Sequence, residues 1–281
     1  MKERTISSAI IFAIATVVAV FSEYLVYPIV LSILAVVAVF EILRVMQSQK
    51  KYVLSIPAYM LAAVFPIISY FITPTTVMPF LLMLAASMFV YLMWLMGVSV
   101  FSRGKIPFSR VSEVFASSLY VTVSFTSLSI MRYIDRKCGI FGIILVFLVA
   151  WGSDVFAFLS GKLFGKHKLI PEVSPKKTVE GSIGGIVSSI VLCLLFGFIV
   201  ELIVNGITVN YIVLGLCGAI LSVVSQLGDL IASLIKREGC VKDYGKIFPG
   251  HGGIMDRFDS VLAVSTILLI IFIVCPPFVF T

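Results

Sequence analysis

Residues 226–259 read QLGDLIASLIKREGCVKDYGKIFPGHGGIMDRFD, and this stretch joins the end of one apolar run to the start of the next. It holds an unusual share of the chain's 14 acidic residues, namely Asp229, Glu238, Asp243, Asp256 and Asp259. Cations and a glycine-rich turn accompany them: Lys236, Arg237, Lys242, Lys246, Arg257 and PGHGG around His251. Carboxylates can hold a hard divalent cation, whereas Lys, Arg and glycine-rich backbone can hold phosphates. We therefore identify this stretch as the candidate active site.

The remainder of the chain is strongly apolar. Hydrophobic residues make up 60% and charged residues 12%, against about 25% charged residues in soluble domains. Apolar runs near the ~20 residues needed to cross a bilayer recur, at 6–22, 25–46, 53–72, 77–101, 113–131, 140–160, 183–204, 211–235 and 259–280. The sequence predicts an all-α polytopic membrane protein with about nine transmembrane helices, the first of them an uncleaved helix.

The distribution of positive charge predicts the orientation. If the N-terminus is cytoplasmic, 18 of the 21 Lys and Arg residues fall on the inner side. The exceptions are Arg132, Arg136 and Lys137. Short cytoplasmic loops retain positive charge, so we expect the N-terminus inside and the C-terminus outside. We expect residues 1–130 to be transmembrane scaffold helices and residues 131–281 to form the catalytic region, with cytoplasmic loops 161–182 and 236–258.

Carboxylates inside the predicted spans indicate a metal site. Asp154 lies about seven residues inside its span, or ~10 Å below the cytoplasmic face, and Asp229 lies at a similar depth. An ionised carboxylate there is costly unless it meets a cation or a polar cavity. Asp256 and Asp259 are three residues apart, on one side of the last span. We expect Asp229 and Asp256 to bind Mg²⁺, with Asp154, Asp259 and Asp243 as further ligands or as partners of the ligands. For Asp154, a buried hydrogen bond that fixes helix packing is the alternative.

Two loops contain candidate phosphate-binding groups. GKLFGKHKLIPEVSPKKTVEGSIGG, residues 161–185, offers Ser174, Lys176, Lys177 and Thr178, although it is not a P-loop. A solvated basic loop that only sets the orientation explains it equally well. In the PGHGG turn, the amides of Gly252 and Gly253 could receive a phosphate. The alternative is a plain helix entry in which His251 makes a structural hydrogen bond.

SLIKREGCVKDYGKIFPGHGGIMDRFD, Ser233 to Asp259, resembles the C-terminal signature of the phosphatidate cytidylyltransferase family at every fixed position. The block from Asp154 through GKLFGKHKLIPEVSPKKTVEG resembles the family's other cytoplasmic segment, so the resemblance covers roughly residues 150–260. One departure is Ala232, where many members carry an acidic residue. Residues 1–130 match only as generic membrane helices.

The resemblance implies that the chain makes CDP-diacylglycerol and pyrophosphate from CTP and phosphatidic acid in a lipid bilayer. It further implies a bacterial inner membrane with a cytoplasmic active site, a possible monovalent cation such as K⁺ beside Mg²⁺, a homodimer, and no nucleic-acid partner. The candidate catalytic residues are Asp229, Asp256, Asp259, Lys236 and Arg237. The candidate substrate-binding residues are Ser174, Lys176, Lys177, Thr178, Lys242, Asp243, His251, Gly252, Gly253 and Arg257.

Two other functions fit parts of the pattern. A CTP-dependent polyprenol or dolichol kinase also combines many spans with basic loops, but it would release CDP instead of pyrophosphate. A membrane transporter would explain carboxylates inside spans. Transporters often contain internal repeats and binding sites near the midplane, whereas this chain has no convincing repeat and its charges gather at one face.

Overall fold

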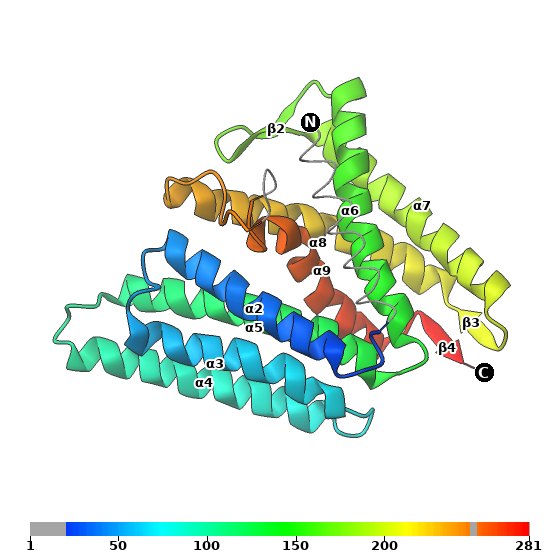
Figure 1. Ribbon diagram of the computed structural model, residues 1–281. Helices are drawn as coiled ribbons and strands as arrows, with labels where there is room; N and C mark the ends of the chain where they lie inside the picture. Colours follow the sequence, from blue (N-terminus) through cyan, green and yellow to red (C-terminus); the bar gives the residue numbers. More distant parts are fainter. Residues whose placement is uncertain (1–20, 248–251, 281) are drawn as a thin grey trace. The chain divides into compact units, whose positions relative to one another are not determined.

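The computed structural model describes residues 21–247 and 252–280 (Figure 1). In this part of the chain, eight helices are long and apolar enough to cross a membrane. They are α2 Val26–Val45, α3 Tyr52–Ile68, α4 Val77–Phe101, α5 Phe108–Ile134, α6 Gly139–Phe164, α7 Val179–Ile203, α8 Tyr211–Glu238 and α9 Met255–Val274, with a 3₁₀ turn at Ser69–Phe71. The predicted helical membrane fold is confirmed, and the count is close to the expected nine. The predicted span 6–22 lies almost wholly outside the described residues.

Within the described residues, four short strands interrupt the helical pattern. β1 Lys168–Ile170 pairs antiparallel with β2 Ser174–Thr178, so the basic segment before α7 is a hairpin. β3 Ile207–Val209 pairs with β4 Phe278–Phe280. The predicted span 259–280 was therefore too long at its C-terminal end. Pro276 and Pro277 follow α9, and proline lacks the amide that a helix would need there.

The chain forms two compact units, residues 1–135 with 239–257 and residues 136–238 with 258–281. In the first unit, α5 contacts α2, α3 and α4. Most of the apolar window of α5, 72%, is buried, against 22% for α4. Buried hydroxyls on α5 join neighbouring helices, as where Ser129 donates to the carbonyl of Pro66 on α3 at 2.9 Å. Small polar residues commonly permit such close packing in membranes, so α5 is the central helix of this unit.

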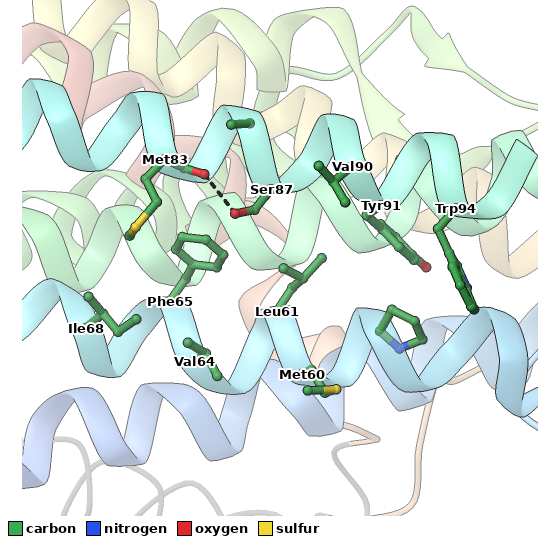
Figure 2. A pocket seen from close by; sticks show the side chains of 12 residues that line it. Met60, Leu61, Val64, Phe65, Ile68, Met83, Ser87, Val90, Tyr91 and Trp94 are labelled. Carbon is green, nitrogen blue, oxygen red and sulfur yellow. Dashed lines mark hydrogen bonds between the residues drawn. The ribbon is translucent and has the colours of Figure 1, made fainter.

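An apolar groove of about 720 Å³ lies between α3 and α4 (Figure 2). Its lining includes Phe65 and Met83 and contains no charged side chain. The polar atoms of the lining are directed to backbone: the hydroxyl of Ser87 donates to the carbonyl of Met83 at 2.8 Å, and the indole of Trp94 donates to the carbonyl of Val53 at 2.9 Å. The groove is therefore compatible with hydrocarbon and unsuited to a phosphate.

In the second unit, α6, α7 and α8 pack against one another. Glycines at the contacts bring the backbones close together. A Cβ at Gly181 on α7 would lie 2.6 Å from the carbonyl oxygen of Ala157 on α6, and a Cβ at Gly218 on α8 would lie 2.6 Å from Cα of Ile190 on α7. This close packing positions the polar residues near the end of α6, the start of α7 and the last turns of α8.

Candidate active site

An ion pair between two elements anchors the polar cluster of the second unit. The ammonium nitrogen of Lys177, on β2, lies 2.6 Å from Oδ2 of Asp229, on α8. Both side chains are largely shielded, with 23% and 29% of their surface exposed. The same ammonium donates to the backbone carbonyl of Gln226 at 3.3 Å, one turn earlier in α8. The Lys177 side chain, which extends from β2, is therefore held in a defined position against α8.

A serine contacts two further aspartates of this unit. The hydroxyl of Ser260, on α9, lies 3.2 Å from Oδ2 of Asp154 on α6 and 3.5 Å from Oδ1 of Asp259. The Ser260 amide also donates to Oδ1 of Asp259 at 2.8 Å. We call Asp154, Asp229, Asp259, Lys177 and Ser260 the carboxylate cluster. It brings together three of the four predicted metal ligands and one predicted phosphate-binding lysine.

Local structure places Lys177 at the cluster. The hairpin leads directly into α7, whose N-cap is Thr178: its hydroxyl accepts the amide of Gly181 at 3.1 Å. Serine and threonine are favoured at this position because their hydroxyl satisfies a free amide of the first turn. The Ser182 hydroxyl then donates to the Gln226 side chain, which returns a bond to the Ser182 carbonyl at 3.2 Å. The start of α7 is thus fixed to α8 beside Asp229.

The carboxylates are close enough to repel one another. Asp229 interacts electrostatically with both Asp154 and Asp259, and Lys177 and Lys236 oppose this repulsion. A cation is the natural partner for such a group of charges. The three aspartates offer carboxylate oxygens as metal ligands. Mg²⁺ prefers such ligands, so the chemistry of these side chains fits that ion. Within residues 21–247 and 252–280, however, no three His, Cys, Asp or Glu side chains converge closely enough to hold a metal ion together.

Asp256 belongs to the first unit, where it organises the glycine-rich segment. Its Oδ2 accepts the amide of Tyr244 at 2.7 Å and the amide of Gly253 at 2.9 Å. The backbone of Gly252 has φ +83°, in the left-handed region that favours glycine. The observed role of Asp256 is therefore to hold backbone at the start of α9, and its role as a metal ligand stays a prediction.

The other predicted site residues are divided among exposed, half-buried and buried positions, and one lies outside the described chain. Ser174 is half-buried on β2, whereas five charged residues are exposed: Lys176, Arg237, Lys242, Asp243 and Arg257. His251 falls outside the described residues. The hydroxyl of Thr178 is committed to the helix cap and packs against Gly161 and Gly165. Sequence reasoning did not find Ser260; its only signal is its place directly after Asp259.

Comparison with known proteins agrees with these features. The model of the cytidylyltransferase family matches residues 2–275. Phosphatidate cytidylyltransferases from Staphylococcus haemolyticus and Bacillus subtilis are 40% identical over 179 residues and 41% identical over 174 residues. These matches cover 64% and 62% of this chain, and 65% and 62% of the relatives' own lengths. The apolar helices and the bacterial relatives indicate an integral membrane protein. The chain belongs to the cytidylyltransferase family.

Proposed function

We propose that the chain makes CDP-diacylglycerol and pyrophosphate from CTP and phosphatidic acid. The observation that carries the proposal is the 2.6 Å pair between Lys177 and Asp229, which belongs to a cluster with Asp154 and Asp259. Such a cluster supplies a fixed ammonium group for phosphate and carboxylates for a divalent cation. The name of the bacterial relatives, phosphatidate cytidylyltransferase, supports the same substrates.

In the proposed reaction, an oxygen of the lipid phosphate attacks the α-phosphorus of CTP. The bond from that phosphorus to the oxygen bridging the α- and β-phosphates breaks, and pyrophosphate leaves with the electron pair. A phosphate monoester has its second pKa at ~6, so it is already largely dianionic at neutral pH. The protein therefore needs no strong base; it must align two anions and neutralise their charge.

The residues of the carboxylate cluster have separate parts in this scheme. Lys177, fixed by Asp229 and by the Gln226 carbonyl, neutralises phosphate oxygens. Asp154, Asp229 and Asp259 would offer carboxylate oxygens to Mg²⁺, although the three do not converge on one point in the described residues; when bound, the ion would supply further charge neutralisation at the triphosphate. Ser260 keeps Asp154 and Asp259 at a fixed separation by contacting both. A monovalent cation such as K⁺, a homodimer, and a cytoplasm-facing site in a bacterial inner membrane remain part of the proposal from family resemblance and charge distribution.

The deciding experiment measures where the α-phosphate of CTP goes and whether pyrophosphate is released. Purified protein in detergent is incubated with phosphatidic acid, Mg²⁺ and CTP labelled at the α-phosphate. The proposal expects label in the lipid fraction and release of pyrophosphate. Labelled CDP in the aqueous fraction, with phosphorylation of an added polyprenol, would replace the proposal with a lipid kinase. No CTP consumption by folded protein would overturn both enzymatic functions and favour a transporter.

A further inference from the structure

Glu41 is a buried carboxylate on α2, far along the sequence from the signature segment. Only 2% of its surface is exposed. Its Oε2 accepts the amide of Met255 at 2.8 Å, and the amide of Ile254 also interacts with the carboxylate. These amides lie where α9 begins, and the first amides of a helix have no partner within the helix. Glu41 therefore caps α9 from a different helix of the same unit.

The second carboxylate oxygen of Glu41 fills space that two glycines leave open. A Cβ at Gly245 would lie 2.0 Å from Oε1 of Glu41, and a Cβ at Gly253 would lie 2.2 Å from it. A Cβ at Gly245 would also lie 2.8 Å from Cα of Gly253. The carboxylate thus packs where the two glycine backbones approach each other, and a side chain at either position would displace it.

A second residue of α2 also holds the backbone that leads to α9. Arg44, one turn after Glu41, donates to the backbone carbonyl of Tyr244. The Tyr244 amide in turn donates to Asp256. Backbone on both sides of residues 248–251 is therefore fixed to α2, at Tyr244 by Arg44 and at Met255 by Glu41. A carboxylate buried in a helix whose other residues are mostly apolar is costly, and capping accounts for the presence of Glu41.

We propose that Glu41 is a positioning residue, which acts through the backbone at Gly245 and Gly253–Met255 to hold Asp256 and the start of α9 in their working geometry. Its part in turnover rests on the proposed function, whereas its hold on the backbone does not. Small displacements of reacting groups cost large factors in rate. Loss of Glu41 should therefore affect turnover although it lies outside the signature.

The first test measures backbone protection without substrate. Hydrogen–deuterium exchange is followed in peptides covering residues 252–257 of the purified full chain. Glu41→Ala leaves the Met255 amide without its acceptor, so exchange there should be roughly 10- to 100-fold faster. Glu41→Gln keeps one acceptor oxygen and should stay near wild type. Ser32→Ala is the control, because it removes a hydrogen bond from α2 to the carbonyl of Ala63 and leaves this segment untouched.

The second test uses the packing against glycine. Gly253→Ala alone should displace the Glu41 carboxylate and reproduce the faster exchange, because the three atoms nearest to its Cβ all belong to Glu41. In a Glu41→Ala background those atoms are gone, so the added methyl should produce a smaller further change. Additive effects of the two substitutions would overturn the proposal, as would unchanged exchange in both single variants. If Glu41→Ala does not fold, Gly253→Ala and Glu41→Gln still give the comparison.

Measurements of kcat then distinguish a positioning role of Glu41 in turnover from a purely structural role. Glu41→Ala should lower kcat roughly tenfold or more, and Glu41→Gln should restore most of it at equal thermal stability. Normal kcat in a Glu41→Ala protein with fast exchange would overturn the functional part. A wild-type protein without cytidylyl transfer but with the expected exchange pattern would refute the proposed function and leave the contact intact.

Discussion

Oδ2 of Asp229 lies 2.6 Å from the ammonium nitrogen of Lys177, so the last turns of α8 and the hairpin before α7 meet through opposite charges. A pair this close and largely shielded fixes both groups. It also means that each residue depends on the other: without Asp229 the ammonium loses its anchor, and without Lys177 the carboxylates lose a neutralising charge.

The pair predicts a strong effect of Lys177 on turnover. Lys177→Met should lower kcat/KM for CTP by roughly 10²- to 10³-fold, because a preorganised charge at the reacting phosphates is lost. Lys168→Met, at an exposed position of the same hairpin, is the matched control and should stay within about fivefold of wild type, since exposed charges contribute little. Steady-state assays with labelled CTP make the comparison. Equal effects of the two substitutions would remove Lys177 from the site.

Ser260 should stabilise the protein through its contacts with two carboxylates. Ser260→Ala removes a hydroxyl whose single hydrogen can be donated to Asp154, at 3.2 Å, or to Asp259, at 3.5 Å, and a hydrogen bond to a charged group contributes about 1.5–3 kcal/mol. We expect a lower thermal unfolding temperature in detergent. Ser188→Ala is the control, because the Ser188 hydroxyl donates only to the carbonyl of Gly185 in its own helix. An unfolding temperature unchanged from wild type in Ser260→Ala would contradict the contact.

Helix packing in the second unit gives a third prediction. Gly218→Ala places a methyl 2.6 Å from Cα and 2.8 Å from the amide nitrogen of Ile190, so α7 and α8 must separate, at a cost of about 1–3 kcal/mol. Gly97→Ala, in α4, meets no atom within 4 Å and should be neutral or raise stability by up to about 1 kcal/mol. Thermal unfolding of both variants checks the difference; a stable Gly218→Ala protein would show that the interface is looser than described.

The sequence predicts the helices well because their signal is local. The apolar run 77–101 coincides with α4, and the predicted span 211–235 ends three residues before α8 does. Length and hydropathy are sufficient for such elements. The strands were missed because each is only three to five residues long and is defined by its pairing partner, which hydropathy cannot reveal.

The site was predictable only as a set of charged residues. Asp154, Asp229 and Asp259 are conspicuous because carboxylates are rare within apolar spans. Ser260 and Glu41 depend on contacts with residues 106 and 214 positions away, and no local pattern identifies those partners. Glu41 did carry a signal, since it is an acidic residue within the predicted span 25–46, but only the contact with Met255 explains its position.

Metal dependence provides the last prediction. Removing divalent ions with a chelator should abolish cytidylyl transfer, and Mg²⁺ should restore it, because the carboxylate cluster supplies oxygen donors of the kind that Mg²⁺ prefers. Asp154→Asn removes one negative charge from the cluster, so the Mg²⁺ concentration for half-maximal activity should rise about tenfold or more. Glu201→Gln is the control: Glu201 is exposed on α7 and accepts a hydrogen bond from Tyr211, away from the cluster. Full turnover in excess chelator would show that these carboxylates act without a divalent ion, whereas an unchanged Mg²⁺ requirement in Asp154→Asn would exclude only that residue as a ligand.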